Sequence, residues 1–164
     1  MRRLLALLRK DRRGVATIEL ALYAPILATM TIGVIDMSNA FARKLALEQA
    51  AQRAIEKVMQ TTGVQDVRGT IIDEAADQAN IPDDEKADKV TVTFRLECDD
   101  DAPQTSNDAD TFDTFTCPTG TVNAVRYIQV EVRDTYEPMF SMHFAGVDAD
   151  GTYHINALAG MRTQ

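Results

Sequence analysis

The apolar positions of the chain form a continuous run near its start and alternate with polar positions near its end. Residues Val15 to Ile35 include 15 apolar residues among 21, and Glu19 is the only charged residue in this run. About 20 residues of α-helix span the hydrocarbon layer of a bilayer. The segment 15–35 is therefore predicted to be a single transmembrane helix.

The helical pattern continues past Asp36 with a narrower apolar face. Apolar residues recur three or four positions apart, and charged or amide side chains occupy the remaining positions. This pattern predicts an amphipathic extension over residues 36–62, with Thr62-Gly63 as its stop. The apolar stripe packs on the protein's own sheet or contacts neighbouring subunits, and the pattern leaves both open. Its members are Leu47, Ala51, Ile55 and Val58.

Residues 63–164 carry the pattern of a small head that combines helix and sheet. A second helix is expected from Gln65 to Ala79 with Asp66 as its cap, followed by a solvated connector over residues 83–89. The expected fold class is α+β, in which the long N-terminal helix lies against an antiparallel sheet. Period-two alternation predicts three strands, over residues 90–98, 125–136 and 153–161.

Charge divides the chain at the apolar run. The net charge is -8, but residues 1–14 hold six basic residues and one acidic residue, a sum of +5, so the remainder sums to -13. An acidic balance of this size argues against nucleic-acid binding through a basic surface. Basic residues before a span favour the cytoplasmic side, so residues 1–14 are predicted to be a cytoplasmic leader and residues 63–164 an extracytoplasmic, periplasmic head.

Glu19 is the exceptional residue of the apolar run. Transferring a carboxylate into hydrocarbon costs about 2.5 to 3.5 kcal/mol on insertion scales. A charged residue in a membrane span is therefore expected to have a function. Gly14 stands just before the run, and Glu19 is the fifth residue after it. Cleavage after Gly14 would leave an ammonium on Val15, which the Glu19 carboxylate of a neighbouring subunit could pair with.

Two simpler interpretations of the run compete with this one. It could be a secretory signal peptide cut after Ala42, because Ala40-Phe41-Ala42 has the small-x-small form, although the run is longer than an ordinary signal core. It could also be a plain membrane anchor, which accounts for the length and the charge asymmetry but not for Glu19.

The N-terminal run resembles a known family. RRGVATIELALYAPILATMTIGVIDMSNAF is similar to the N-terminus of TadE-like proteins, the minor pilins or pseudopilins of the bacterial tight-adherence (Tad, Flp-type) pilus, over roughly residues 12 to 60. The matching positions include Gly14, Glu19, Pro25, Gly33 and Asp36. The family commonly has an aromatic residue after the Glu, whereas this chain has Leu20.

The resemblance implies a pilin-like fold and a place in a pilus system. The protein would be a single-pass protein of the bacterial inner membrane that helps to assemble an adhesion pilus, with no enzymatic activity of its own. The partners implied are the major Flp-type pilin, a second TadE-like minor pilin, the inner-membrane assembly platform and the prepilin peptidase, with membrane lipid around the helix. The peptidase would act at Gly14 and Val15 and read Glu19 and Leu20.

The two cysteines fit an extracytoplasmic head. Cys98 ends the first predicted strand, and Cys117 precedes a Pro-Thr-Gly turn 19 positions later. Outside the cytoplasm such a pair most often forms a disulfide, although two reduced thiols are the alternative.

The loop between these cysteines collects acidic residues and has no Lys or Arg. Oxygen ligands on a loop could hold calcium, but Asp108-x-Asp110 lacks the Gly and the distal Glu of an EF-hand, and Asp148-x-Asp150-Gly151 has its Gly too early. A solvated outer loop is the simpler interpretation. The alternative function is a membrane-tethered periplasmic binding module whose acidic disulfide loop recognises a ligand.

Candidate catalytic groups are few. His143 and His154 are the only imidazoles, no serine lies in a Gly-x-Ser-x-Gly context, and no phosphate-binding Gly-rich loop occurs. Neither an enzyme, a cofactor nor a metal centre is expected. The apolar segment Glu137 to Phe144 is expected to pack in the core, with an exposed docking patch as the alternative.

Overall fold

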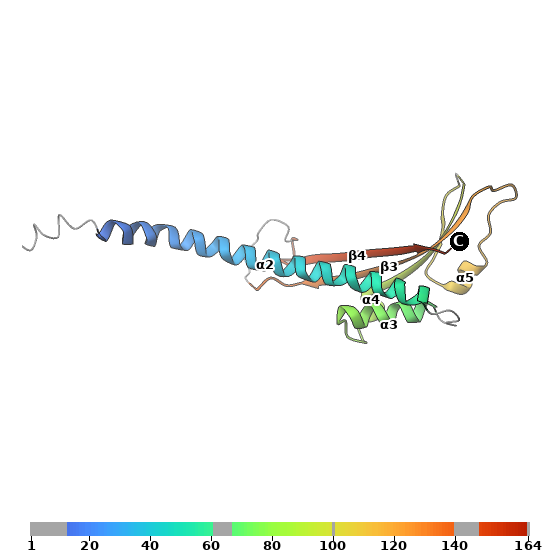
Figure 1. Cartoon of the computed structure of the whole chain (residues 1–164), viewed down its shortest axis with the longest axis horizontal. Helices are drawn as coiled ribbons and strands as arrows, with labels where there is room; N and C mark the ends of the chain where they lie inside the picture. Colours follow the sequence, from blue (N-terminus) through green and yellow to red (C-terminus); the bar gives the residue numbers. More distant parts are fainter. Residues whose placement is uncertain (1–12, 61–66, 100, 140–147, 164) are drawn as a thin grey trace, which may run out of the picture.

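The computed structural model describes residues 13–60, 67–99, 101–139 and 148–163. One helix, α2, runs without a break from Arg13 to Gln60 and is about 72 Å long at 1.5 Å per residue. Its second half lies along a sheet, and its first half projects beyond the head (Figure 1). The prediction of one helix from the apolar run to about residue 60 is confirmed.

In its described residues, the head contains four strands and three further helices. All neighbouring strands pair antiparallel in the order β2-β1-β3-β4. The three predicted strands are present with nearly the predicted bounds. The strands are β1 (Val90–Cys98), β2 (Gln104–Ser106), β3 (Ala124–Tyr136) and β4 (Tyr153–Arg162), and the helices are α3 (Val67–Ala79), α4 (Lys86–Lys89) and α5 (Ala109–Asp113).

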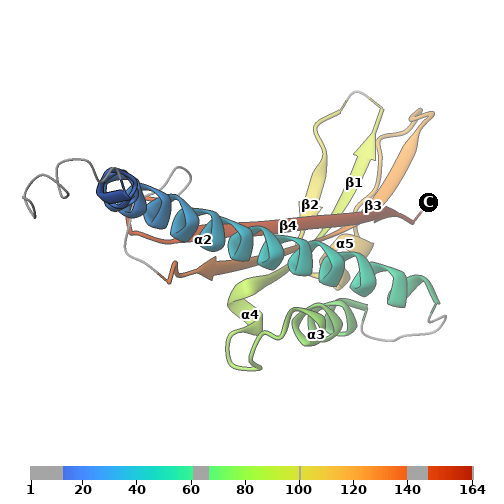
Figure 2. The same ribbon diagram turned by 60° about the vertical axis from the view of Figure 1, so that its left-hand side comes forward.

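Helices α2 and α3 cover one face of the sheet. Helix α2 crosses β3 and β4, while α3 lies beside α2 over β1 (Figure 2). The alternation seen in the sequence is the reason, because every second residue of β1 is buried and those between are half-buried. The register places Val92 opposite Val130 and Val130 opposite Ala159, so apolar side chains form rows across three strands.

Small side chains allow α2 and α3 to lie close together. Each helix contributes three buried alanines to the cluster between them, and Ile71 of α3 is fully buried beside them. Short side chains bring helix axes near each other, so the contact relies on close packing rather than on large residues. The alanines are Ala50, Ala51 and Ala54 on α2 and Ala75, Ala76 and Ala79 on α3.

Two short helices and one strand lie where the sequence indicated only loops. The connector over 83–89, expected to be solvated and irregular, contains α4, and the loop between the cysteines contains β2 and α5. A hydrophobic cluster explains the second case, because Phe112 of α5 is buried and stacks on Phe94 of β1 at 5.4 Å between centroids. Elements of three to five residues have no periodicity to detect.

Other expectations fall at the borders of the described residues. The predicted cap Asp66 and the stop Thr62-Gly63 lie outside them, as do residues 140–147 of the apolar segment and His143. The expectation that this segment is core is wrong for Met139, whose side chain is 69% exposed. Residues 148–151 form a turn in which Gly151 has a positive φ of 85°.

Candidate functional site

The first half of α2 is the most unusual surface of the molecule. Every side chain from Val15 to Thr31 is exposed, although the segment is strongly apolar. It is the one helix among the described residues with the length and composition to cross a membrane. An apolar surface of this size is not stable in water and requires lipid or other protein around it.

Glu19 lies within this exposed apolar surface. Its side chain forms no hydrogen bond or ion pair with any residue that the structure describes, and the head lies too far along α2 to supply one. Gly14, Val15 and Leu20 are in the same helix, with Val15 four residues before Glu19 and therefore one turn below it. Among the described residues, this carboxylate is thus left exposed and without a partner in an apolar surface.

Pro25 lies in the same segment and interrupts the backbone hydrogen bonding of α2. A proline nitrogen has no hydrogen to donate to the carbonyl four residues earlier. Two threonine hydroxyls in the following turns donate to other backbone carbonyls, Thr29 to Pro25 and Thr31 to Leu27, each at 2.8 Å. These bonds satisfy the hydroxyls within the helix, as a hydrocarbon environment requires.

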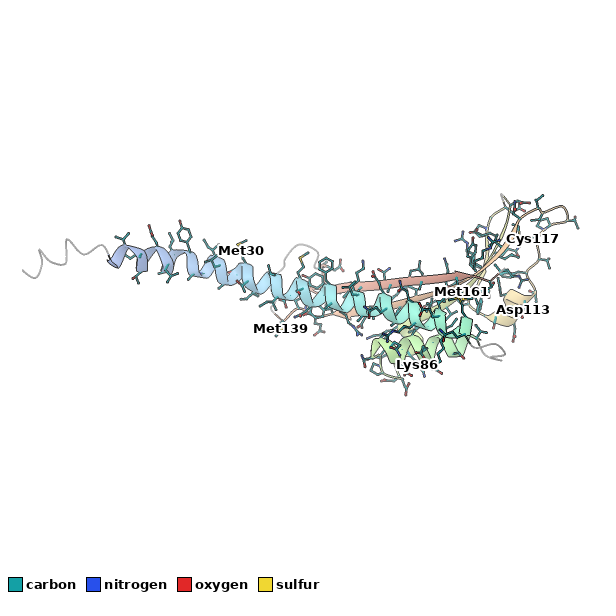
Figure 3. The ribbon with its side chains drawn as sticks, in the orientation of Figure 1. Met30, Lys86, Asp113, Cys117, Met139 and Met161 are labelled. Carbon is teal, nitrogen blue, oxygen red and sulfur yellow. A yellow bond between two sulfur atoms is a disulfide. The ribbon has the colours of Figure 1, made fainter. Side chains whose placement is uncertain are left out.

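Asp36 marks the point at which α2 meets the head. Its side chain is fully buried, and its Oδ1 accepts a hydrogen bond of 2.9 Å from the backbone N–H of Met139, 103 residues later. Oδ2 has no hydrogen-bond partner among the described atoms. Figure 3 shows Met139 beside α2 where the helix leaves the head, and Met30 farther out on the free half.

The sequence contained a signal for this contact. Buried or half-buried residues of α2 recur at steps of three and four, and Asp36 belongs to that series. We identified Asp36 only as a charge at the end of the apolar run, because an acidic residue is rarely assigned to a buried stripe. The series is Gly33, Asp36, Ala40, Arg43 and Leu47.

A cluster of charges around Asp134 fixes the angle of α2 on the head. Arg43 of α2 donates from Nε to Asp134 of β3 at 2.7 Å and from Nη1 to the carbonyl of Ala79 at 2.7 Å. Lys89 of α4 donates to the other oxygen of Asp134 at 2.7 Å and pairs with Glu85 at 2.7 Å. Three separate elements, α2, β3 and α4, thus meet at one carboxylate that is only 9% exposed, and Arg43 also ties the end of α3 to them.

The protonation of this cluster follows from its contacts. Burial by itself raises the pKa of Asp134, but hydrogen bonds from Lys89 and Arg43 outweigh it and hold the pKa below its usual value. The same bond to Asp134, with a second to Glu85, raises the pKa of Lys89. Both shifts favour the charged forms of Asp134 and Lys89 at neutral pH. Its role is structural, because it joins helix to sheet.

A groove lies between α2 and the start of β4. It has a volume of about 210 Å³ and is lined mainly by apolar groups. Its place is next to the exit from the apolar half, since α2 contributes residues only one to two turns beyond Asp36. The lining includes Met37, Ala40, Phe41 and Lys44 of α2 and Tyr153 and Ile155 of β4.

At the opposite end of the head, Cys98 and Cys117 form the expected disulfide, with their Cα atoms 5.6 Å apart. Two acidic residues in the described part of the enclosed loop, Asp99 and Asp108, have structural roles. Asp99, at a positive φ of 42°, accepts hydrogen bonds from the backbone N–H groups of Val122 and Asn123, both at 2.8 Å. Those bonds hold the pKa of Asp99 below its usual value.

Asp108 caps α5 in a similar way. It accepts hydrogen bonds from Thr111 through both the hydroxyl, at 2.6 Å, and the backbone N–H, at 3.1 Å, which lower its pKa. Among the described residues, no three acidic, histidine or cysteine side chains come together as a metal site. His154 is exposed, as expected, and its Nε2 lies 2.8 Å from Asp150 of the preceding turn. Neither the loop nor the histidine supports the binding-module interpretation.

Comparison with known families agrees with the geometry of α2. Residues 14–55 match the model of the family described as TadE-like protein, which ends within the part of α2 packed on the head. No curated protein and no solved structure matches the chain. The family is associated with Tad pilus systems and is not enzymatic. The match confirms the resemblance found in the sequence, and α2 carries the TadE-like segment of this protein.

Proposed function

We propose that this protein is a minor pilin or pseudopilin of a Tad (Flp-type) pilus, anchored in the bacterial inner membrane by residues 15–35. The observation that carries the proposal is the free half of α2, which exposes an apolar surface with the lone Glu19 and matches the TadE-like family. The protein acts by binding neighbours in the membrane. Its head is periplasmic, and the basic residues 1–14 stay in the cytoplasm.

Glu19 is the residue through which neighbouring subunits join. After cleavage between Gly14 and Val15, the new ammonium of one subunit pairs with the Glu19 carboxylate of a neighbour displaced by one helical turn, about 6 Å. The pair offsets the cost of burying both charges in hydrocarbon. The absence of a partner for Glu19 among the described residues of its own chain supports this role.

The partners follow from this geometry and from the family. Helices with the same apolar character surround α2, namely the major Flp-type pilin and a second TadE-like minor pilin. The inner-membrane assembly platform takes up the subunit, and the prepilin peptidase removes residues 1–14, reading Gly14, Val15, Glu19 and Leu20.

N-terminal sequencing of the membrane-extracted protein tests the processing step. A start at Val15 is the expected result. A start at Arg43 would contradict the proposal, because the membrane segment would have been removed. The fold argues against that cut, since Ala40-Phe41-Ala42 lies within continuous helix and Ala40 is buried against the head.

The substitution Glu19→Gln tests the pairing itself. Glutamine keeps the size of the side chain and removes its charge, so the variant should insert into the membrane normally but fail to co-purify with other pilus subunits. Glu56→Gln, on an exposed site at the far end of α2, is the matched control and should assemble as the native protein does. Normal pilus assembly by Glu19→Gln would exclude charge pairing.

A further inference from the structure

Large apolar side chains remain exposed on α2 beyond the predicted end of the membrane span. Met37 is 46% exposed, Phe41 is 56% exposed and Leu45 is 56% exposed. Leu45 lies about 13 Å past Asp36 along the helix axis, which is farther than the headgroup layer extends. Lipid therefore does not account for the whole patch, which needs a protein partner.

Met37 and Phe41 of this patch belong to a seam that begins within the membrane segment, and Leu45 is adjacent to Lys44 at its upper end. Large exposed apolar side chains recur at alternating steps of three and four from residue 20 to residue 41, which is the heptad spacing at which two parallel helices pack along their length. The seam ends after Glu48, because the next positions, Ala51 and Ile55, are buried against the head. The seam consists of Leu20, Tyr23, Leu27, Met30, Val34, Met37 and Phe41.

The groove beside β4 lies at the upper end of this seam. Met37 and Phe41 line it together with Ala40, Lys44 and Ile155. Its volume of about 210 Å³ is below the roughly 300 Å³ of small-molecule pockets, but suits one inserted side chain. An aromatic residue from a parallel helix would reach it at the depth of Phe41.

We propose that two copies of this protein pair side by side in the membrane through the seam, with Phe41 of each copy entering the groove of the other. A second copy has its own apolar seam at the same membrane depth, so the two align without displacement. The contact is reciprocal, as two-fold pairing requires. Antiparallel pairing through the β4 edges is excluded, because it would point one membrane helix away from the bilayer.

Charge also favours a second copy. Lys44 and Glu48 approach each other only to 3.9 Å within one chain, and both side chains are about half exposed. They follow Phe41 at the upper end of the seam, so in a parallel pair Lys44 of each copy comes within reach of Glu48 of the other, on both sides of the two-fold axis. The ammonium of Lys44 thus faces a carboxylate of the other copy where the apolar seam ends.

This pair is distinct from the arrangement in a pilus. It places both helices at equal depth, whereas the contact between Glu19 and Val15 requires a displacement of one turn. The pair is the form that the full chain takes in a membrane without other pilus proteins. It depends on the membrane anchor and not on cleavage or assembly.

Cysteine crosslinking tests the pair, because both native cysteines form the Cys98–Cys117 disulfide and none is free. Single variants Met37→Cys and Phe41→Cys are expressed as the full chain in a host without pilus genes and oxidised in isolated membranes. Each is expected to give a covalent dimer at twice the 18.1 kDa of the chain. The matched controls Ser38→Cys and Ala42→Cys are exposed, one residue along and a quarter turn away, and should give none.

Three results would overturn the proposal. One is equal crosslinking at residues 38 and 42, another is no dimer at residues 37 and 41, and the third is a crosslink that forms only with a different protein. A check of the native disulfide on non-reducing gels ensures that each variant has folded. Phe41→Glu in a Met37→Cys background should abolish the dimer, because a carboxylate cannot enter the apolar groove.

Discussion

The two halves of α2 belong to one continuous helix and differ in almost everything else. The part from Val15 to Thr31 is largely apolar and exposed on all sides, whereas the part after Asp36 is amphipathic and buries one stripe on α3 and the sheet. The two halves are similar in length. The first half requires lipid or neighbouring proteins around it, whereas the second half is covered by its own sheet. The role of each half therefore follows from its surroundings.

The largest effect on stability should come from truncating a buried side chain in the second half of α2. Leu47→Ala removes a fully buried side chain of the second half and should lower the free energy of unfolding by about 2 to 5 kcal/mol. Leu27→Ala, in the free half, should leave the stability of the head unchanged, since Leu27 is 58% exposed. Urea denaturation in detergent, followed by circular dichroism, measures both. Equal losses would show that the free half also supports the head.

A smaller effect is expected from the charge cluster that holds the second half in place. Asp134→Asn weakens the bonds to Arg43 and Lys89 and should cost about 2 kcal/mol. Because the pKa of Asp134 is lowered in the folded state, its contribution is present at neutral pH and is lost as the pH falls through that lowered value. Acid titration of stability should therefore be flatter in Asp134→Asn than in the native protein. An unchanged acid profile would contradict the role of Asp134.

The smallest effect should be found at the junction between the halves. Asp36→Ala removes the acceptor for the Met139 N–H and should cost about 1 kcal/mol in stability. Asp36→Asn keeps an oxygen acceptor in that place and should lose less. Thermal unfolding of the two variants in detergent distinguishes them. If both variants lose the same amount, the charge of Asp36 and not its hydrogen bond matters there.

The sequence predicted the parts of this protein that repeat over many residues. The apolar run, the stripe around Leu47 and the alternation in β1 each extend over two or more turns or pleats, so periodicity alone located them. The disulfide was predicted from the compartment and from two cysteines. The TadE-like resemblance followed from the order of residues around Gly14 and Glu19 and was confirmed by the family match.

Short or long-range features escaped prediction. Helix α5 has five residues and depends on the packing of Phe112 against Phe94 of β1. In the cluster at Asp134, the hydrogen bonds between different elements join residues that are 36 to 91 positions apart in the sequence. Single acidic residues look alike in a sequence. Only their neighbours in space distinguish Asp99, which orders a turn, from an acidic residue that could bind an ion.

The sequence by itself determined that one helix is long, that its first half requires an apolar environment and that Glu19 is the exceptional charge there, because hydrophobicity and helical periodicity are local properties. Tertiary structure alone decided where the helix stops touching its own head, that Asp36 is buried at that point, and that Met37 and Phe41 remain uncovered beside β4. Those facts depend on segments more than 100 residues apart coming together, and no local pattern specifies such contacts.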